Sequence, residues 1–336
     1  DWKIGTTFSA KGYSNNSHTI KLEYDSNHST EVKEYSVTTA FANNTYTPTL
    51  VSNGNYAAGQ LTKTITKDEN WTSGLAHTTE EFKNKKGQVV LKRTYAKVGT
   101  GTTLQAHDTF YVYDSFGNLS YVLSPKAEGQ GGIPTSTELN ELCYQYKYDH
   151  RNRLVEKRIP GKGWEYIIYD NLDRPVMTQD SNQRTHQVSG QTVPQWIITK
   201  YDKLGRVAYT AIHTNSITNR VTMQNEFNSQ NNTASEYYEE RAPSNLDYDN
   251  SYYYNTHFPT ANLTLLAVNY YDDYDFTNDG TANFQYDISF DNQFVSPASA
   301  PVPFDRVKGL VTGSKVKNLK TDEWLTTVTF YDNKGR

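Results

Sequence analysis

A short phrase recurs along the chain and constrains the fold more than any other feature of the sequence. It reads Tyr-Asp, two variable residues, a residue that tolerates a left-handed backbone, and then Arg or Asn. The copies begin at Tyr113, Tyr148, Tyr169, Tyr201 and Tyr331. The fourth residue after each Tyr is, in turn, Gly117, Asn152, Asp173, Gly205 and Gly335. Gly, Asn and Asp enter the left-handed region at low cost, and a tight reversal between antiparallel strands requires that region. The phrase therefore predicts a hairpin turn at each copy.

The other fixed positions of the phrase can hold the turn together. The second-position Asp can accept backbone N–H groups and so fix where the strand stops. These residues are Asp114, Asp149, Asp170, Asp202 and Asp332. Four copies end in Arg, namely Arg153, Arg174, Arg206 and Arg336. An Arg at this place can lie across a Tyr ring of a neighbouring strand, a contact of about 0.5–1 kcal/mol. We interpret these residues as structural, with turns at 115–117, 150–152, 171–173 and 203–205, and a degenerate copy, "FKNKKGQ", at Phe82.

The composition favours strands over helices. The apolar residues are mostly aromatic, with 27 Tyr, 13 Phe and 5 Trp against 2 Met and 1 Cys. Aromatic and β-branched side chains suit a pleated, half-wet surface. We therefore expect an all-β fold built as an array of antiparallel hairpins.

Spacing between the copies divides the chain into four segments. We expect a β-rich segment with degenerate repeats at 1–106 and the hairpin array at 107–214. The array contains a short helical insertion near 135–143, where Thr135 and Glu138 are spaced as a capping box. An Asn- and Tyr-rich insertion follows at 215–303, interpreted as a surface excursion with some strands of its own. The segment 304–336 holds a further repeat that the sequence cuts off before its second strand.

The phrase and two longer strings resemble the RHS/YD-repeat family. The strings are "CYQYKYDHRNRLVEKRIPGKGWEYIIYDNLDRPV" and "VKGLVTGSKVKNLKTDEWLTTVTFYDNKGR", and they are similar to the long, secreted, bacterial branch of that family. The resemblance implies a curved sheet that spirals into part of a hollow cage or barrel wall. Bacterial members enclose a C-terminal toxin, toxin-complex subunits form similar cocoons, and animal teneurins use a related barrel for adhesion.

Two functions follow from the resemblance. The favoured one is a shell segment of a large secreted or cell-surface bacterial protein that encloses a C-terminal toxin or other cargo. Its partners would be the rest of the same polypeptide, the enclosed domain and secretion machinery. The alternative is an extracellular adhesion or carbohydrate-binding module, since exposed Tyr and Trp rows suit cell-surface glycans.

Other classes of function find little support in the sequence. It has no His-Glu-x-x-His, Cys-x-x-Cys, Gly-x-Ser-x-Gly or phosphate-binding glycine loop, so we expect neither an enzyme nor a cofactor. Cys143 and His150 are seven residues apart, and we interpret them as a buried small residue and a turn residue. A net charge of −4 argues against nucleic-acid binding. No apolar stretch approaches the ~20 residues of a membrane span.

One loop weakly resembles a calcium site. Asp275, Thr277 and Asp279 stand at alternate positions before Gly280. The twelfth position, where a bidentate Glu is expected, is Tyr286. We favour an acidic turn between strands over a metal site.

Overall fold

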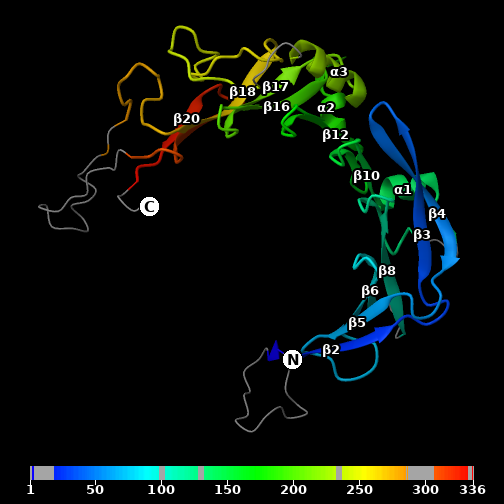
Figure 1. Ribbon diagram of the computed structural model, residues 1–336. Coiled ribbons are helices and arrows are strands. Elements are labelled where there is room, and N and C mark those ends of the chain that lie inside the picture. Colours follow the sequence, from blue (N-terminus) through cyan, green and yellow to red (C-terminus); the bar gives the residue numbers. More distant parts are fainter. Residues whose placement is uncertain are drawn as a thin grey trace, which may run out of the picture. The chain divides into compact units, whose positions relative to one another are not determined.

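The computed structural model describes residues 2–3, 19–97, 103–127, 132–231, 237–284, 286, 306–331 and 335. The chain divides into two compact units, Asp1–Trp164 (unit 1) and Glu165–Arg336 (unit 2). Figure 1 follows the chain from blue to red through both units. The boundary falls inside the predicted 107–214 array, between its second and third copies of the phrase. The four-segment division itself stays a prediction.

Unit 1 is a sequence of antiparallel strands with one short helix. Its elements are β1 (Trp2–Lys3), β2 (Thr19–Ser26), β3 (Lys33–Ala42), β4 (Thr45–Asn55), β5 (Thr62–Lys67), β6 (Thr78–Lys83), β7 (Val89–Lys97), β8 (Leu104–Tyr113), β9 (Leu119–Leu123), α1 (Ser136–Leu142), β10 (Tyr144–Tyr148) and β11 (Leu154–Arg158). Strand β1 pairs with β2, β2 pairs with β5, and from β5 each strand pairs with the next as far as β11.

The long β3–β4 hairpin packs against this sheet and closes the core of unit 1. Figure 1 draws β3 and β4 beside β8. Tyr35 of β3 meets Phe110 of β8 edge to face, with ring centroids 5.1 Å apart. Phe82, Leu91 and Leu123 are completely buried in the same cluster. The core therefore lies between the hairpin and one face of the β6–β9 sheet.

Unit 2 repeats the hairpin plan and adds two helices. Its elements are β12 (Trp164–Tyr169), which begins at the boundary, β13 (Pro175–Gln179), α2 (Ser181–Arg184), β14 (Gln187–Val188), β15 (Gln191–Thr192), β16 (Gln195–Tyr201), β17 (Val207–Thr214), α3 (Arg220–Asn231), β18 (Leu263–Tyr271), β19 (Val311–Lys317) and β20 (Trp324–Val328). The main sheet runs β12, β13, β16, β17, β18, β19, β20, each strand antiparallel to its neighbour.

The described part of the segment 215–303 is not a surface excursion, and that expectation was wrong for these residues. Its described part supplies an inner strand of the sheet, β18, and buried side chains of the core. Met223 and Phe227 of α3 pack with Tyr253, and Tyr270 stacks on Phe276 with centroids 4.4 Å apart. The described part of this segment therefore covers one face of the unit 2 sheet.

The predicted fold class is confirmed. The four predicted turns join the pairs β8–β9, β10–β11, β12–β13 and β16–β17. Within the described ranges, helix is confined to α1, α2 and α3, of 7, 4 and 12 residues. The predicted insertion helix is confirmed as α1, and the Thr135–Glu138 capping box is formed in both directions.

Candidate functional site

The repeated phrase folds into one hydrogen-bonded turn that is the same from copy to copy. At Asp202, the backbone N–H donates to Arg206 O at 2.8 Å and Gly205 N–H donates back to Asp202 O at 2.9 Å. The carboxylate Oδ1 accepts from the backbone N–H groups of Leu204 and Arg206, at 2.9 Å each. Asp114, Asp149 and Asp170 make the same set of bonds, and all four carboxylates are buried.

The predicted left-handed residues have positive φ. The angles are 91° at Gly117, 58° at Asn152, 62° at Asp173 and 78° at Gly205. Each hairpin also carries a register shift immediately before its Tyr, as between Lys200 and Tyr201. The chain thus reverses at these four residues.

The degenerate copy at Phe82 forms the same turn with an amide in place of the carboxylate. Asn84 Oδ1 accepts from the backbone N–H groups of Lys86 and Gln88, at 2.9 and 3.0 Å. Gly87 N–H donates to Asn84 O at 2.9 Å, and Gly87 has φ of 78°. A negative charge is therefore not needed to form the turn.

The Arg residues bridge their own turn to the next hairpin. The Nε groups of Arg153, Arg174 and Arg206 donate to the second carboxylate oxygen of the turn Asp, at 2.7, 2.7 and 2.6 Å. The Arg174 guanidinium then lies 4.5 Å from the Tyr201 ring centroid, and Arg206 lies 4.2 Å from that of Tyr271. The predicted Arg/Tyr stacking is thus confirmed at these two positions.

The Tyr hydroxyls connect each hairpin to the preceding one, a role that the sequence analysis missed. Each donates to the carbonyl of the residue that opens the second strand of the preceding hairpin. The bonds are Tyr113 to Val89 at 3.1 Å, Tyr148 to Leu119 at 2.8 Å, Tyr201 to Pro175 at 2.8 Å and Tyr331 to Val311 at 2.7 Å. Burial raises the pKa of Tyr148 to about 12, so its hydroxyl stays protonated and donates. The sequence did contain a sign of this role, because all five copies have Tyr at this position and none has Phe, which lacks the hydroxyl.

A further turn of the same kind joins β18 to β19, although the segment 273–308 interrupts it. Asp272 N–H donates to Leu310 O at 3.2 Å, and Asp272 Oδ1 accepts from Gly309 N–H at 2.6 Å. Tyr271 donates its hydroxyl proton to Val207 O at 2.9 Å. Sequence reasoning missed this copy because the two halves of the phrase are far apart in the chain.

The last copy of the phrase is described only in part. Gly335 has φ of 72°, which agrees with its predicted place in a turn. Asp332 and Arg336 lie outside the described residues.

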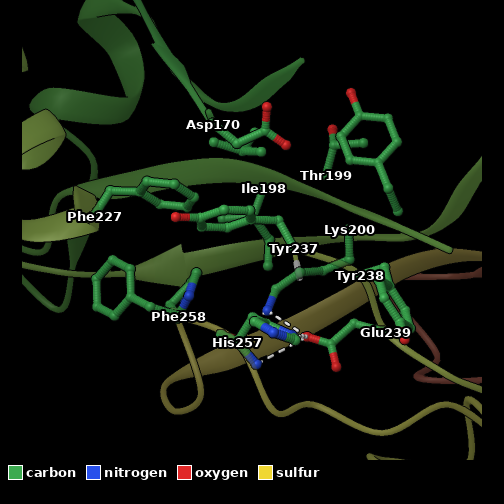
Figure 2. A pocket seen from close by; sticks show the side chains of 13 residues that line it. Asp170, Ile198, Thr199, Lys200, Phe227, Tyr237, Tyr238, Glu239, His257 and Phe258 are labelled. Carbon is green, nitrogen blue, oxygen red and sulfur yellow. Dashed lines mark hydrogen bonds and ion pairs between the residues drawn. The ribbon is translucent and has the colours of Figure 1, made fainter. Parts of the chain in front are cut away.

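Unit 2 also contains a buried charged cluster that the sequence analysis did not identify. Lys200 of β16 donates from Nζ to Glu239 Oε1 at 2.8 Å, and the side chains are 8% and 1% exposed. Figure 2 shows Lys200 and His257 turned toward Glu239, with Phe227 and Phe258 in the same pocket. The centre of a water molecule can occupy only ≈ 20 Å³ of this pocket. It has room for about one water molecule and no sugar.

The acidic loop at Asp275 binds its own backbone. The Asp275 carboxylate accepts from the N–H groups of Asp279 and Gly280, at 3.1 and 2.7 Å, and Thr277 N–H donates to Asn283 Oδ1 at 2.8 Å. Within the described ranges, no three His, Cys, Asp or Glu side chains are placed to hold a metal ion. The residues act as a turn in the geometry that we see.

Two further sequence observations find a place in the structure. Cys143 is buried, and burial raises the pKa of its thiol, which disfavours the thiolate. His150 is exposed and pairs with the Asn44 side chain.

None of the helices in the described part of the chain is long and apolar enough to cross a membrane.

Comparison with known proteins finds likeness only among solved structures. No protein-family model matches the chain, and no curated protein matches it. The crystal structure of TcdB2-TccC3 without its hypervariable C-terminal region is similar at 14% identity and a TM-score of 0.34, over 82% of this chain and 14% of that one. The crystal structure of TcdB2-TccC3-Cdc42 is similar at 12% identity and a TM-score of 0.33, over 89% of this chain and 17% of that one. The chain thus spans a small part of the structures that it matches, and TM-scores this low do not decide its family.

Proposed function

We propose that this chain is a segment of the shell of a large secreted bacterial protein of the RHS/YD-repeat type, and that the shell encloses a C-terminal toxin or other cargo. The proposal includes the curving of the sheet into a cage wall that the resemblance implies. The partners would be the rest of the same polypeptide and the enclosed domain.

The Tyr hydroxyl bonds carry the proposal. The bonds from Tyr113, Tyr148, Tyr201, Tyr271 and Tyr331 each tie one hairpin to the hairpin before it. A turn that bonds itself through Asp and its neighbour through Tyr can be repeated without limit, because each unit contacts mainly the next. Each added hairpin therefore extends the sheet, as the wall of a shell requires. The Tyr, Asp and Arg side chains of the phrase are engaged in these hydrogen bonds, as expected for residues with a structural role.

Protease protection in the natural polypeptide tests the proposal. The part that follows the repeats should be cut more slowly within the intact protein than when it is expressed alone. An Asp202→Ala variant, which weakens one turn of the wall, should raise the rate of cutting toward that of the free part. Asp25→Ala is a matched control, because the Asp25 carboxylate is exposed and, among the described residues, bonds only the adjacent Ser26 N–H.

Equal cutting rates for the enclosed and the free part would contradict the shell. If the intact protein in addition binds cell-surface glycans on an array, the adhesion module becomes the better account. Binding of no glycan together with slow cutting supports the shell.

A further inference from the structure

Lys200 lies against a side-chain amide as well as a carboxylate. Its Nζ donates to Glu239 Oε1 at 2.8 Å, to Asn255 Oδ1 at 3.2 Å and to the backbone carbonyl of His257. Because a carbonyl bond is about 1.2 Å long, Cγ of Asn255 is no more than about 4.4 Å from Nζ. A near-attack separation is about 3–3.5 Å, so a small shift of either side chain brings the amine onto the amide carbon.

The Oδ1 atom of the Asn255 amide accepts hydrogen bonds that polarise it, whereas Nδ2 makes none with the described residues. Its Oδ1 accepts from the Tyr209 hydroxyl at 3.2 Å as well as from Lys200. Its Nδ2 is buried, and the described residues offer it no hydrogen-bond partner. A buried, unpaired amide nitrogen costs free energy, about 1–3 kcal/mol. Loss of that nitrogen would remove the cost.

Glu239 is the acid and base of the cluster. Oε1 faces Lys200 and also accepts from His257 N–H at 3.1 Å, while Oε2 accepts from Thr256 N–H at 2.8 Å. These bonds fix the carboxylate between the amine and the chain that carries Asn255. The carboxylate is thereby placed to take a proton from Nζ.

We propose that Lys200 and Asn255 form an intrachain amide bond, with Glu239 carrying the proton and ammonia leaving. The Lys200 ammonium gives one proton to Glu239 and its freed lone pair attacks Cγ of Asn255, forming the new C–N bond. Negative charge on Oδ1 is held by the Tyr209 hydroxyl. Glu239 returns a proton to Nδ2, and the old C–N bond breaks as ammonia departs. The amide left behind is neutral, a second proton leaves with ammonia as ammonium, and no oxidant or metal is needed.

Burial, hydrogen bonds and charge shift the pKa of both Lys200 and Glu239. Burial lowers the pKa of Lys200, although the charge of Glu239 opposes that shift, and so favours the reactive amine. Burial alone would raise the pKa of Glu239, but the bonds from His257 and Thr256 and the charge of Lys200 outweigh it and lower that pKa to about 2. The three oxygen acceptors around Nζ match the three N–H donors of an ammonium, so the step starts from ammonium and carboxylate. The reaction passes through the neutral pair and needs to occur only once per molecule.

Lys63 in unit 1 is a natural control. Its Nζ lies 2.7 Å from Glu31 and 3.1 Å from Glu80, both carboxylates, and no side-chain amide of the described residues is bonded to it. Lys63 is buried as well. A buried lysine with carboxylates but no amide cannot release ammonia. Comparing the two sites therefore distinguishes the effect of burying a lysine from the effect of a neighbouring amide.

Mass spectrometry of the folded protein tests the bond. After incubation the intact chain should be lighter than its sequence by one ammonia, about 17 Da. Trypsin should leave Lys200 uncut and yield a branched peptide that joins the Lys200 and Asn255 segments. An unchanged mass, trypsin cleavage at Lys200, or an ammonia loss that maps to a linear peptide would overturn the proposal.

Three variants and a control assign the groups. Lys200→Met, Asn255→Ala and Glu239→Gln should each abolish the mass loss, whereas Lys63→Met should retain it in full. Circular dichroism shows whether each variant folds. The branched peptide of the unaltered protein decides the question even if a variant unfolds, and a mass loss that persists in folded Glu239→Gln contradicts the assigned role of Glu239.

Discussion

Two pairs of turns have the same backbone conformation but end in different side chains. The first pair lies in unit 1, at Asn84 and Asp114, and the second in unit 2, at Asp170 and Asp202. The first pair ends in Gln88 and Asn118. The second pair ends in Arg174 and Arg206. In both pairs the left-handed residue donates its N–H back to the carbonyl of the turn Asn or Asp. The lengths are 2.9 Å at Asn84 and 3.1 Å at Asp114 in the first pair, and 3.2 Å at Asp170 and 2.9 Å at Asp202 in the second. The closing residue therefore does not set the backbone of the turn.

What the closing residue changes is the contact with the next hairpin. Gln88 donates to Gly117 O at 3.3 Å, and Asn118 donates to Asn152 Oδ1 at 3.1 Å, both neutral hydrogen bonds. Arg206 instead covers the Tyr271 ring and forms two bonds with the Asp272 carboxylate, at 3.0 and 2.7 Å. Charge-assisted, two-pronged bonds are roughly twice as strong as neutral ones. The comparison indicates that the last residue of the phrase sets how firmly neighbouring hairpins hold together.

The largest expected effect comes from removing the turn carboxylate. Asp202→Ala leaves two backbone N–H groups in part-buried hydrogen bonds without their acceptor and the Arg206 guanidinium without one partner, so it should lower the free energy of unfolding by about 3 kcal/mol. Asp114→Ala also leaves two backbone N–H groups without their acceptor, but its second oxygen loses a neutral partner, the Asn118 side chain, in place of a charged Arg. It should therefore cost less, about 2 kcal/mol. Denaturant titration measures both. Equal decreases in the free energy of unfolding would contradict the distinction between turns that end in Arg and turns that end in a neutral side chain.

The left-handed residue should matter next. Gly205 has φ of 78°, and forcing a β-branched residue there should cost more than about 1 kcal/mol in Gly205→Val. Gly205→Asn should be nearly silent, as Asn152 adopts φ of 58° in its own copy. Thermal unfolding compares the two variants, and equal shifts would show that φ does not limit the turn.

The Tyr hydroxyl should contribute about the same in both kinds of turn. Tyr201→Phe keeps the ring beneath Arg174 and removes only the bond to Pro175 O, so about 1 kcal/mol should be lost. Tyr113→Phe should lose the same amount, because its bond to Val89 O does not involve Arg. Denaturant titration is again the measurement, and a loss at one site alone would tie the hydroxyl to the Arg-ended turns.

The smallest expected effect is an acid sensitivity at the contact between Arg206 and Asp272. The Arg206 guanidinium lowers the pKa of Asp272 below its ordinary 3.8. A depressed carboxyl pKa stabilises the fold above the unfolded value, and this is lost as the pH falls through the folded value. The two side chains are each 23% exposed, so we expect less than about 1 kcal/mol. Unfolding of the unaltered protein and of Asp272→Asn below pH 4 should show the difference, whereas Asn118→Ala should leave the pH profile unchanged.

The sequence sufficed for those features that local chemistry decides. The turn at Lys203–Gly205 follows from a left-handed residue after an N–H acceptor, and helix α1 follows from the Thr135–Glu138 capping box. Both are set by residues a few positions apart. The role of Arg174 over Tyr201 was also predictable, because both residues are fixed by the phrase.

Features that depend on distant residues escaped prediction. Helix α3 is polar apart from a few residues such as Met223 and Phe227, so its sequence gives little sign that it covers a sheet. The Lys200 cluster unites residues 200, 239 and 255, which no local pattern connects. The turn at Asp272 is completed by Gly309, across a long interruption. In each case tertiary packing decided what the local sequence left open.

Hydrogen exchange on Tyr201→Phe tests most directly the central claim that each hairpin is held by the next. Loss of the bond from Tyr201 to Pro175 O should speed amide exchange in the preceding strand β13, Pro175–Gln179, as well as around Tyr201 itself, and leave exchange in β6 and β7 of unit 1 unchanged. Faster exchange confined to β16 and β17, with β13 as protected as before, would contradict the account.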